Sequence, residues 1–265
     1  DVELVAVDPL GRLAPDAAAA ALRDDTSLLS LGYANNEVGT VQDVAAIAAV
    51  ARERGVPVHV DAVQAAGWLP LSAAALGVDA VSLAGHKLGA PKGTGVLGVR
   101  GRVPLEPLLH GGGQERGRRS GTENVAGAVG LATALELAEA AREEASARVG
   151  ALRDRFVTQV LAAVPAAALT GDPVHRLPGT ASFTFAGTSG EAVLLELERR
   201  GIVSSSGSAC AAGSDEPSHV LVAMGIDPEV ARTAVRFTFP ASLDQPLDAV
   251  ADAVAASVSA VRSGG

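Results

Sequence analysis

Residues 44–64 read VAAIAAVARERGVPVHVDAVQ, and this stretch decides the fold. The run Val56–Val60 reads as a short apolar strand, and Gly55 before it is a residue type that often ends a helix. Apolar residues at helical spacing precede that glycine: Val44, Ile47, Ala48 and Ala51. A helix followed directly by an apolar strand predicts one layer of an α/β fold.

The same alternation continues on both sides of this stretch. Strands are predicted at Thr26–Leu31, Asp79–Leu83 and Thr94–Val99, with a connecting helix at Leu71–Leu76. This order favours a mostly parallel sheet flanked by helices, in which ligands bind at the carboxyl ends of the strands. Three polar clusters stand at such ends: Asn35-Asn36-Glu37, Asp61-Ala62-Val63-Gln64 and His86-Lys87.

The second half of the chain has a different pattern. A long helix or helix pair is predicted from Asn124 to about Leu161, because the segment is rich in Ala, Glu, Arg and Leu. We place a domain boundary near residue 141, which gives a large domain at residues 1–141 and a small α+β domain at residues 142–265. The small domain is predicted to contain strands at Thr180–Phe185, Gly201–Ser205 and Val235–Phe239, and helices at Glu191–Arg200, His219–Met224 and Leu247–Val261.

Composition narrows the class of protein. The 265 residues are 48% hydrophobic and 19% charged, enough to bury a sizeable core. The net charge of -9 argues against direct nucleic-acid binding, and the basic runs at Lys87–Lys92 and Arg116–Arg119 suit a small anion better. No apolar run is long enough to cross a membrane and no signal-peptide pattern is present, so we predict a cytoplasmic protein without a membrane partner.

Lys87 and Asp61 are the first candidates for chemistry. Lys87 lies in a loop just past an apolar strand, where its amine could form a Schiff base, although most such lysines are simply solvated. Asp61 ends a strand, where a carboxylate can pair with the ring nitrogen of pyridoxal 5′-phosphate (PLP). From sequence alone, a helix cap for residues 62–66 explains Asp61 equally well.

Other polar residues near these ends could bind a ligand. Gln64 and His86 could hydrogen-bond a cofactor, or could be ordinary polar residues. Asn36 could contact cofactor or substrate, while the alternative is a turn that uses Asn and Gly. The segments Gly111–Arg116 and Arg118–Thr122 offer amides, guanidinium groups and hydroxyls to an anion, or form a solvated loop.

Two residues of the small domain are also candidates. Cys210 is the only cysteine, so neither a disulfide within the chain nor a multi-cysteine zinc site can form. Small residues surround it in Ser204–Gly213, which predicts an accessible thiol in a loop. Arg236 lies inside an apolar strand, where it needs a partner such as a substrate carboxylate or a structural salt bridge.

In this order, the motifs resemble those of the cysteine desulfurases, which are PLP-dependent enzymes. The resemblance covers essentially the whole chain and implies the aspartate aminotransferase-like fold. Each motif alone is weak, but the set is highly specific. The motifs are Asn35-Asn36-Glu37-Val38-Gly39, Asp61-x-x-Gln64, Gly85-His86-Lys87, Gly111-Gly112-Gly113-Gln114-Glu115-Arg116, Arg119-Ser120-Gly121-Thr122, Ser205-Ser206-Gly207-Ser208-Ala209-Cys210 and Arg236.

The resemblance implies roles for the residues around the cofactor. Lys87 would hold PLP, Asp61 would pair with the pyridine nitrogen, and His86 would contact the phosphate. Gln64 and Asn36 would contact the side of the ring that carries the phenolic oxygen. Thr122 would reach the phosphate of a neighbouring subunit, which implies a homodimer.

The resemblance also implies a reaction. L-Cysteine would be the substrate, with its carboxylate held by Arg236 and Asn36 and its Cα proton moved by Lys87. Cys210 would take the sulfur as a persulfide, and L-alanine would leave. The stretch Ala211–His219 resembles the long-loop branch, which implies an iron–sulfur scaffold or another sulfur acceptor as partner and a role in iron–sulfur cluster assembly or tRNA thiolation. Any metal would belong to that partner.

The chain departs from the family pattern in two places. Ala84 replaces a serine that often contacts the phosphate, so one phosphate hydrogen bond is expected to be lost or replaced. Val2–Val7 already alternates like a strand, and the family's upstream phosphate loop and ring-stacking histidine are absent. We therefore expect the sequence to begin partway through the fold and, if it is the whole molecule, to bind PLP weakly or not at all.

Three rival interpretations stay open. Another class V PLP enzyme, such as an aminotransferase, a selenocysteine lyase or a cysteine-sulfinate lyase, would keep Asp61 and Lys87 but would not need the Cys210 loop. A non-catalytic fragment is the second rival, since part of the site is missing. A nucleic-acid binder is the weakest, because no aromatic residues lie among Arg116, Arg118 and Arg119.

Overall fold

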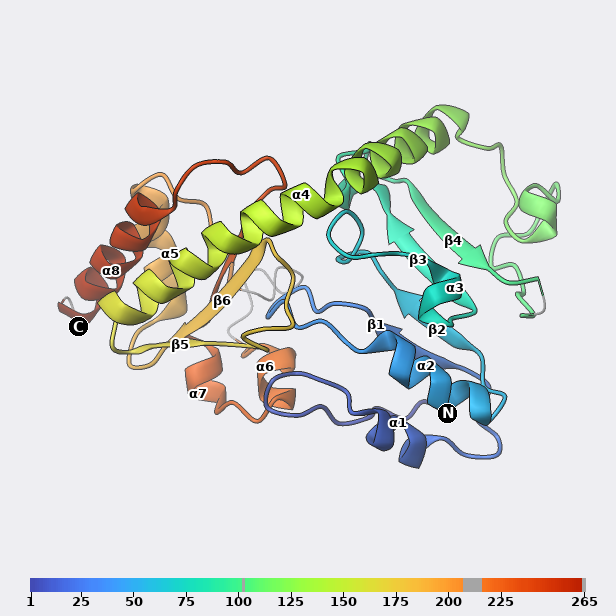
Figure 1. Cartoon of the computed structure of the whole chain (residues 1–265), viewed down its shortest axis with the longest axis horizontal. Helices are drawn as coiled ribbons and strands as arrows, with labels where there is room; N and C mark the ends of the chain where they lie inside the picture. The colour runs from blue at the N-terminus through green and yellow to red at the C-terminus, as the bar shows by residue number, and fades with distance from the viewer. Residues whose placement is uncertain (102, 207–215, 264–265) are drawn as a thin grey trace. The chain divides into compact units, whose positions relative to one another are not determined.

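The computed structural model describes residues 1–101, 103–206 and 216–263, which fall into two compact units (Figure 1). The mixed-sheet unit contains Leu22–Tyr33 and Val44–Ala141. The antiparallel-sheet unit contains Asp1–Ala21, Ala34–Asp43 and Arg142–Gly265. The two N-terminal segments of this second unit were assigned to the large domain from sequence, and the domain division stays a prediction.

Four strands form the mixed sheet in the order β1 (Leu29–Gly32), β2 (Val58–Asp61), β3 (Ala80–Ala84) and β4 (Gly95–Val99). The first three run parallel, and β4 runs antiparallel to β3. With the helices beside it, this sheet confirms the predicted α/β class.

Helix α2 (Val44–Glu53) packs against β2, as residues 44–64 predicted. The face it buries consists of Val44, Ile47, Ala48 and Ala51. Val58 and Val60 are the buried residues of β2. Gly55 has a φ of 70°, a left-handed conformation that glycine adopts without strain, and the chain turns there into the strand.

The other side of the mixed sheet is polar. Ser30 Oγ lies 2.8 Å from His59 Nδ1, and His59 Nε2 lies 3.1 Å from Ser82 Oγ. These side chains share one face because Ser30 pairs with His59 across two parallel strands. Three neighbouring strands are therefore linked by side-chain hydrogen bonds on a face that is only partly covered.

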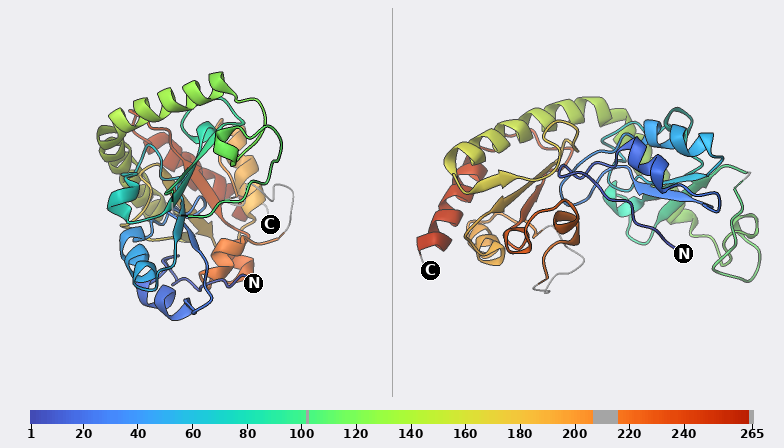
Figure 2. Two further views of the ribbon diagram at one scale, coloured as in Figure 1. Left: turned by 90° about the vertical axis from the view of Figure 1, so that its right-hand side faces the viewer. Right: turned by 90° about the horizontal axis from the view of Figure 1, so that it is seen from below.

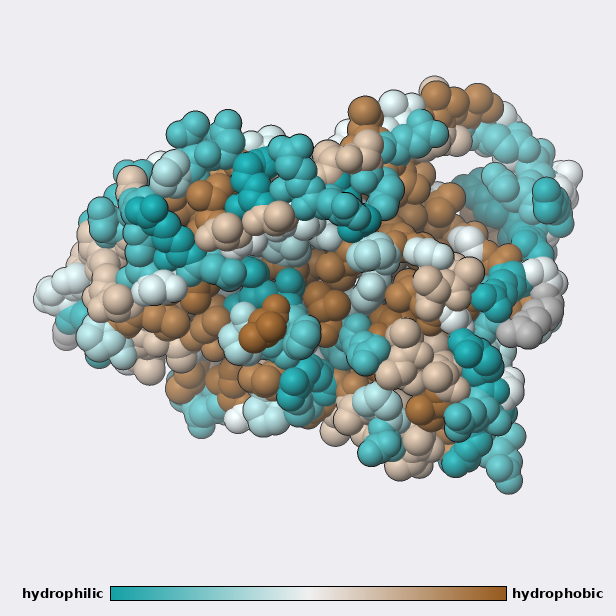
Figure 3. Space-filling model, in the orientation of Figure 1, coloured by the Kyte–Doolittle hydropathy of each residue, from teal (hydrophilic) through white to brown (hydrophobic). Residues whose placement is uncertain are grey.

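The remaining helices of this unit are short. They are α3 (Ala73–Leu76) and the 3₁₀ helices η1 (Gly85–Lys87) and η2 (Glu115–Gly117). The longest helix, α4 (Val125–Ala163), begins here and continues into the other unit. Apolar side chains on its first turns are exposed and form a hydrophobic patch in Figure 3. No helix in the described ranges is both long and apolar enough to span a bilayer.

The second sheet is fully antiparallel, in the order β5 (Ala167–Leu169), β6 (Thr180–Phe185) and β7 (Val235–Thr238). Phe156 of α4 is fully buried against it, with ring centroids 5.2 Å from Phe237 and 6.0 Å from Phe183. Edge-to-face rings of this kind form the core of the unit. Figure 2 shows the C-terminal half of α4 lying across this sheet. The other helices of the unit are α1 (Pro15–Ala21), α5 (Gly190–Arg199), α6 (His219–Ala223), α7 (Pro228–Ala231) and α8 (Asp248–Ser263).

Two predicted strands are wrong. Val2–Val7 alternates in sequence but has no regular structure, and its first residues are exposed. Gly201–Ser205 contains only an isolated bridge, from Ser205 to Arg236. Alternation alone does not make a strand, because each strand also needs a partner for its backbone N–H and C=O groups.

Candidate functional site

Asp61 is the last residue of β2, and the two oxygens of its carboxylate differ in their contacts. Its Oδ1 accepts a hydrogen bond from Val63 N at 2.9 Å and so closes a turn, but residues 62–66 form no helix, and the predicted helix cap is wrong. The side chain is exposed, and Oδ2 has no partner among the described residues. Gln64 follows in the same turn and is half-buried. One carboxylate oxygen thus stays available to a ligand.

Lys87 and His86 lie at the same edge of the sheet as Asp61. They are exposed residues of η1, which starts directly after β3, the parallel neighbour of β2. Gly85 fixes the start of η1, because a Cβ there would lie 2.2 Å from Thr94 Oγ1. The main chain at Gly85 therefore passes close to Thr94. This contact fixes the backbone at the start of η1, and Lys87 is the last residue of that short helix.

The glycine-rich segment forms a loop closed by its own hydrogen bonds. Gly113 N donates to Ser120 Oγ at 3.3 Å, and Gly121 N donates to Gln114 Oε1 at 3.0 Å. Thr122 comes next, exposed and just before α4. Most residues of this loop are exposed, in agreement with the solvated loop that the sequence left open, and side chains of Gln114 and Ser120 close it.

Asn36 and Arg236 come together in the antiparallel-sheet unit. Arg236 Nη1 donates to the main-chain oxygen of Asn36 at 2.8 Å. Asn35 forms the turn, since its Oδ1 accepts from Glu37 N at 2.8 Å and from Val38 N at 3.0 Å. Asn36 is left exposed at the tip of this turn, beside the guanidinium group.

Arg236 also fixes the start of the segment that carries Cys210. Its N–H donates to Ser205 O at 2.6 Å, and Ser205 N donates to its carbonyl oxygen at 3.1 Å. Cys210 itself lies outside the described residues. The predicted carboxylate-binding arginine and the base of the cysteine segment are thus adjacent across one backbone bridge.

Arg176 supports the same turn and was not predicted from the sequence. Its Nη2 donates to Val38 O and to Thr170 O, each at 2.7 Å, and only 5% of the residue is exposed. Burial, with a smaller effect of Arg153, lowers the pKa of Arg176 to about 10. It remains protonated at neutral pH, so a buried cation holds the main chain two residues after Asn36.

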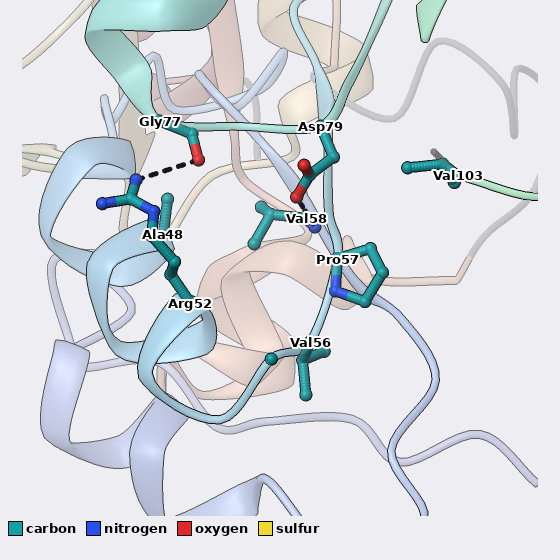
Figure 4. Close-up of a pocket in the computed structure, with 9 residues that line it drawn as sticks. Ala48, Arg52, Val56, Pro57, Val58, Gly77, Asp79 and Val103 are labelled. Carbon is teal, nitrogen blue, oxygen red and sulfur yellow. Dashed lines mark hydrogen bonds between the residues drawn. The ribbon is translucent and has the colours of Figure 1, made fainter. Parts of the chain in front are cut away.

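A cavity of about 310 Å³ in the mixed-sheet unit lies elsewhere (Figure 4). Val58 and Asp79, which line it, stand where β2 and β3 begin, whereas Asp61 and Lys87 stand where these strands end. Its polar groups contact main chain: Arg52 Nη2 donates to Gly77 O at 3.1 Å, and Asp79 Oδ2 accepts from Val58 N at 3.1 Å. Because its polar groups already bond the main chain, we assign this cavity a structural role at the end of the sheet where β2 and β3 begin.

Comparison with known proteins identifies the family. The Aminotransferase class-V family model matches residues 1–245. The chain belongs to this family. Its members use PLP, and the predicted fold is confirmed by a solved NifS-like protein with a TM-score of 0.85 at 34% identity, covering 99% of this chain and 67% of that one.

Two curated relatives of this class-V chain are cysteine desulfurases. A cysteine desulfurase of Gluconacetobacter diazotrophicus is 47% identical over 98% of this chain and 66% of its own length. An IscS-like cysteine desulfurase of Mycobacterium tuberculosis is 49% identical over 90% of this chain and 61% of its own length. The chain therefore spans just under two thirds of the length of these relatives.

Proposed function

We propose that this class-V chain carries the lysine and the acceptor thiol of a cysteine desulfurase, which converts L-cysteine to L-alanine with a persulfide on Cys210. The observation that supports this best is the position of Arg236. It contacts Asn36 through its side chain and Ser205 through its backbone, so a carboxylate-binding group lies at the base of the Cys210 segment.

The mixed-sheet unit fits PLP by the chemistry of its side chains. An amine at Lys87 suits the aldehyde of the cofactor, and the open oxygen of Asp61 suits a protonated pyridine nitrogen. Gln64 and His86 would hold the ring substituents and the phosphate, and Thr122 would serve the phosphate of a second subunit. When bound, PLP withdraws electrons from the Cα of an amino acid.

Each residue then has a defined task. Arg236 and Asn36 hold the substrate carboxylate, since a guanidinium group can bind both oxygens. The Lys87 amine takes the Cα proton and returns it, acting as general base and acid. The Cys210 thiolate attacks the substrate sulfur, so an S–S bond forms as the C–S bond breaks. Cysteine leaves as alanine and Cys210 gains one sulfur atom, so no external oxidant is needed.

The wider role is part of the proposal. The relatives' names support L-cysteine as substrate, and the long segment after Cys210 supports transfer to an iron–sulfur scaffold or another acceptor. We propose a homodimer, because Thr122 is exposed just before α4. The cytoplasmic location stays a prediction.

Mass spectrometry of the protein after incubation with PLP and L-cysteine, without reductant, tests this proposal. We expect a gain of one sulfur atom, about 32 Da, on the peptide that contains Cys210. A Cys210→Ser variant should show no such gain. Absence of the adduct from the unsubstituted protein, with PLP bound, would overturn the proposed function.

A further inference from the structure

Helix α4 begins with an apolar stretch whose outer side is exposed. From Val125 to Leu135, eleven consecutive residues carry no charged side chain. Val125 and Val129, which lie one turn apart on the same side of the helix, are 67% and 60% exposed. Apolar side chains that gather on the surface of a protein mark a contact with another molecule when they form a continuous area.

The opposite side of these turns packs on the helix's own unit. A Cβ on Gly127 would lie 2.7 Å from Thr94 Cγ2, so the helix approaches the unit closely there, and Leu131 is buried. The exposed side is therefore the outer one, and Figure 3 shows it as part of the hydrophobic patch at the start of α4. We call it the outer stripe, which consists of Val125, Ala126, Val129, Ala132 and Thr133.

The two ends of the outer stripe differ in charge. The loop from 115 to 123, which leads into α4, carries three arginines and two glutamates, and so has one net positive charge. The dipole of α4 adds a positive partial charge at the same end. Beyond the stripe come Glu136 and Glu139, and no basic residue precedes Arg142. The stripe therefore runs from a positive end to a negative end.

These properties fit a second copy of the chain. A two-fold axis brings the same surface of two copies together, so the surface must complement itself. When two α4 helices pair in antiparallel directions, the negative end of each stripe meets the positive end of the other. The uncharged middle lets the copies touch although each chain has a net charge of -9.

We propose that two copies of the chain associate through their outer stripes, with the α4 helices antiparallel and Val129, the middle of the stripe, at the two-fold axis. This inference rests on the proposed function, which includes a homodimer, and adds the surface through which the subunits meet. Thr122, the residue proposed to serve the second subunit, precedes Val125 by three residues. Contact at the start of α4 thus brings Thr122 to the boundary between the copies.

Val129→Glu is the decisive variant. In the proposed dimer each new carboxylate faces its own copy across the axis, and like charges in contact oppose association strongly. We expect the dissociation constant of the dimer, measured by sedimentation over a dilution series, to rise about a hundredfold or more. Val174→Glu is the matched control, because Val174 is a 74% exposed valine of the other unit, and its dissociation constant should be unchanged.

A cysteine at the axis gives a second test that does not depend on weakening the dimer. Cys210 is the only cysteine, so Val129→Cys is made in a Cys210→Ser background and oxidised glutathione is added as the oxidant. A disulfide needs Cα atoms within about 7 Å, which a residue at the axis of two packed helices satisfies. We expect a disulfide-linked dimer on a non-reducing gel, while Val174→Cys in the same background should stay largely unlinked.

The outcomes separate this inference from the proposed function. A chain that stays monomeric across the dilution series overturns the inference and leaves the stripe to the part of the relatives' length that this chain does not match. A dimer that folded Val129→Glu does not weaken, or the absence of the Val129→Cys disulfide, overturns it too. A persulfide on Cys210 in a monomer would overturn this inference alone. A dimer that passes both tests but forms no persulfide would overturn the proposed function alone.

Discussion

Replacing Arg176 with methionine removes a buried cation from beneath the Asn35–Gly39 turn. Two hydrogen bonds of 2.7 Å are lost, and the carbonyl groups of Val38 and Thr170 lose their donor. Hydrogen bonds from a charged group contribute about 1.5–3 kcal/mol each, so the loss amounts to about 3–6 kcal/mol. The methionine side chain fills similar space without a charge.

The opposing effect is relief of a buried charge. Burial lowers the pKa of Arg176 to about 10, and a change of this size corresponds to about 3 kcal/mol of lost charge solvation. We therefore expect Arg176→Met to lower the free energy of unfolding by only about 0–3 kcal/mol. Arg176 is charged below about pH 10, so the cost of burying its charge is constant there and falls only at higher pH. The difference in unfolding free energy between Arg176→Met and the unsubstituted protein should therefore be constant between pH 6 and 8.

The effect on the site should exceed the effect on stability. With Val38 O released, the turn that carries Asn36 loosens, and KM for L-cysteine in the proposed reaction should rise several-fold. Arg153→Met is the matched control, since Arg153 is also 5% exposed but binds Leu177 O rather than the turn. Denaturant unfolding and steady-state kinetics measure the two quantities. A stability loss above about 5 kcal/mol, or an equal rise in KM for both variants, would refute the reasoning.

Two further perturbations test the antiparallel-sheet unit. Phe156→Ala should cost about 3–5 kcal/mol of unfolding free energy, because it opens a cavity among aromatic rings, and denaturant unfolding that shows less than about 1 kcal/mol would contradict this packing. Burial alone would raise the pKa of Asp172, but two backbone N–H groups and Arg12 outweigh it and lower the pKa. The stabilisation is therefore present above about pH 4 and lost as the pH falls below it, so Asp172→Asn should flatten the acid limb of a plot of Tm against pH. Identical acid limbs for the two proteins would count against this contribution.

Local patterns predicted the elements whose burial is periodic. The helix over 44–53 and the strand after it were readable because a stripe of apolar residues on the helix faces the two buried valines of the strand, Val58 and Val60. Strand β5 was missed because Ala167–Leu169 is short and carries no β-branched residue. The antiparallel direction of β4 depends on how a long connection folds back, which residue types do not record.

Some residues of the candidate site could be predicted from the sequence, and others became visible only in the folded structure. Asp61 and Lys87 stand out in sequence because polar residues follow apolar strands. Glu37 was noticed only as part of a motif, and nothing nearby in the sequence points to Ser218. The hydrogen bond from Ser218 Oγ to Glu37 Oε2, like that of Arg176 with Val38, joins segments far apart in the chain and becomes visible only once the unit is folded.

The bond from Arg236 to Asn36 has a consequence for evolution. It is made to a main-chain oxygen, so any residue at position 36 can supply it. A long side chain loses about 0.5–1.5 kcal/mol of entropy when a ligand immobilises it, but this guanidinium group is already oriented by folding. In the proposed reaction, drift at position 36 would therefore remove one carboxylate contact while the Arg236 guanidinium group stays oriented, which leaves room for new substrates to arise without rebuilding that group's support.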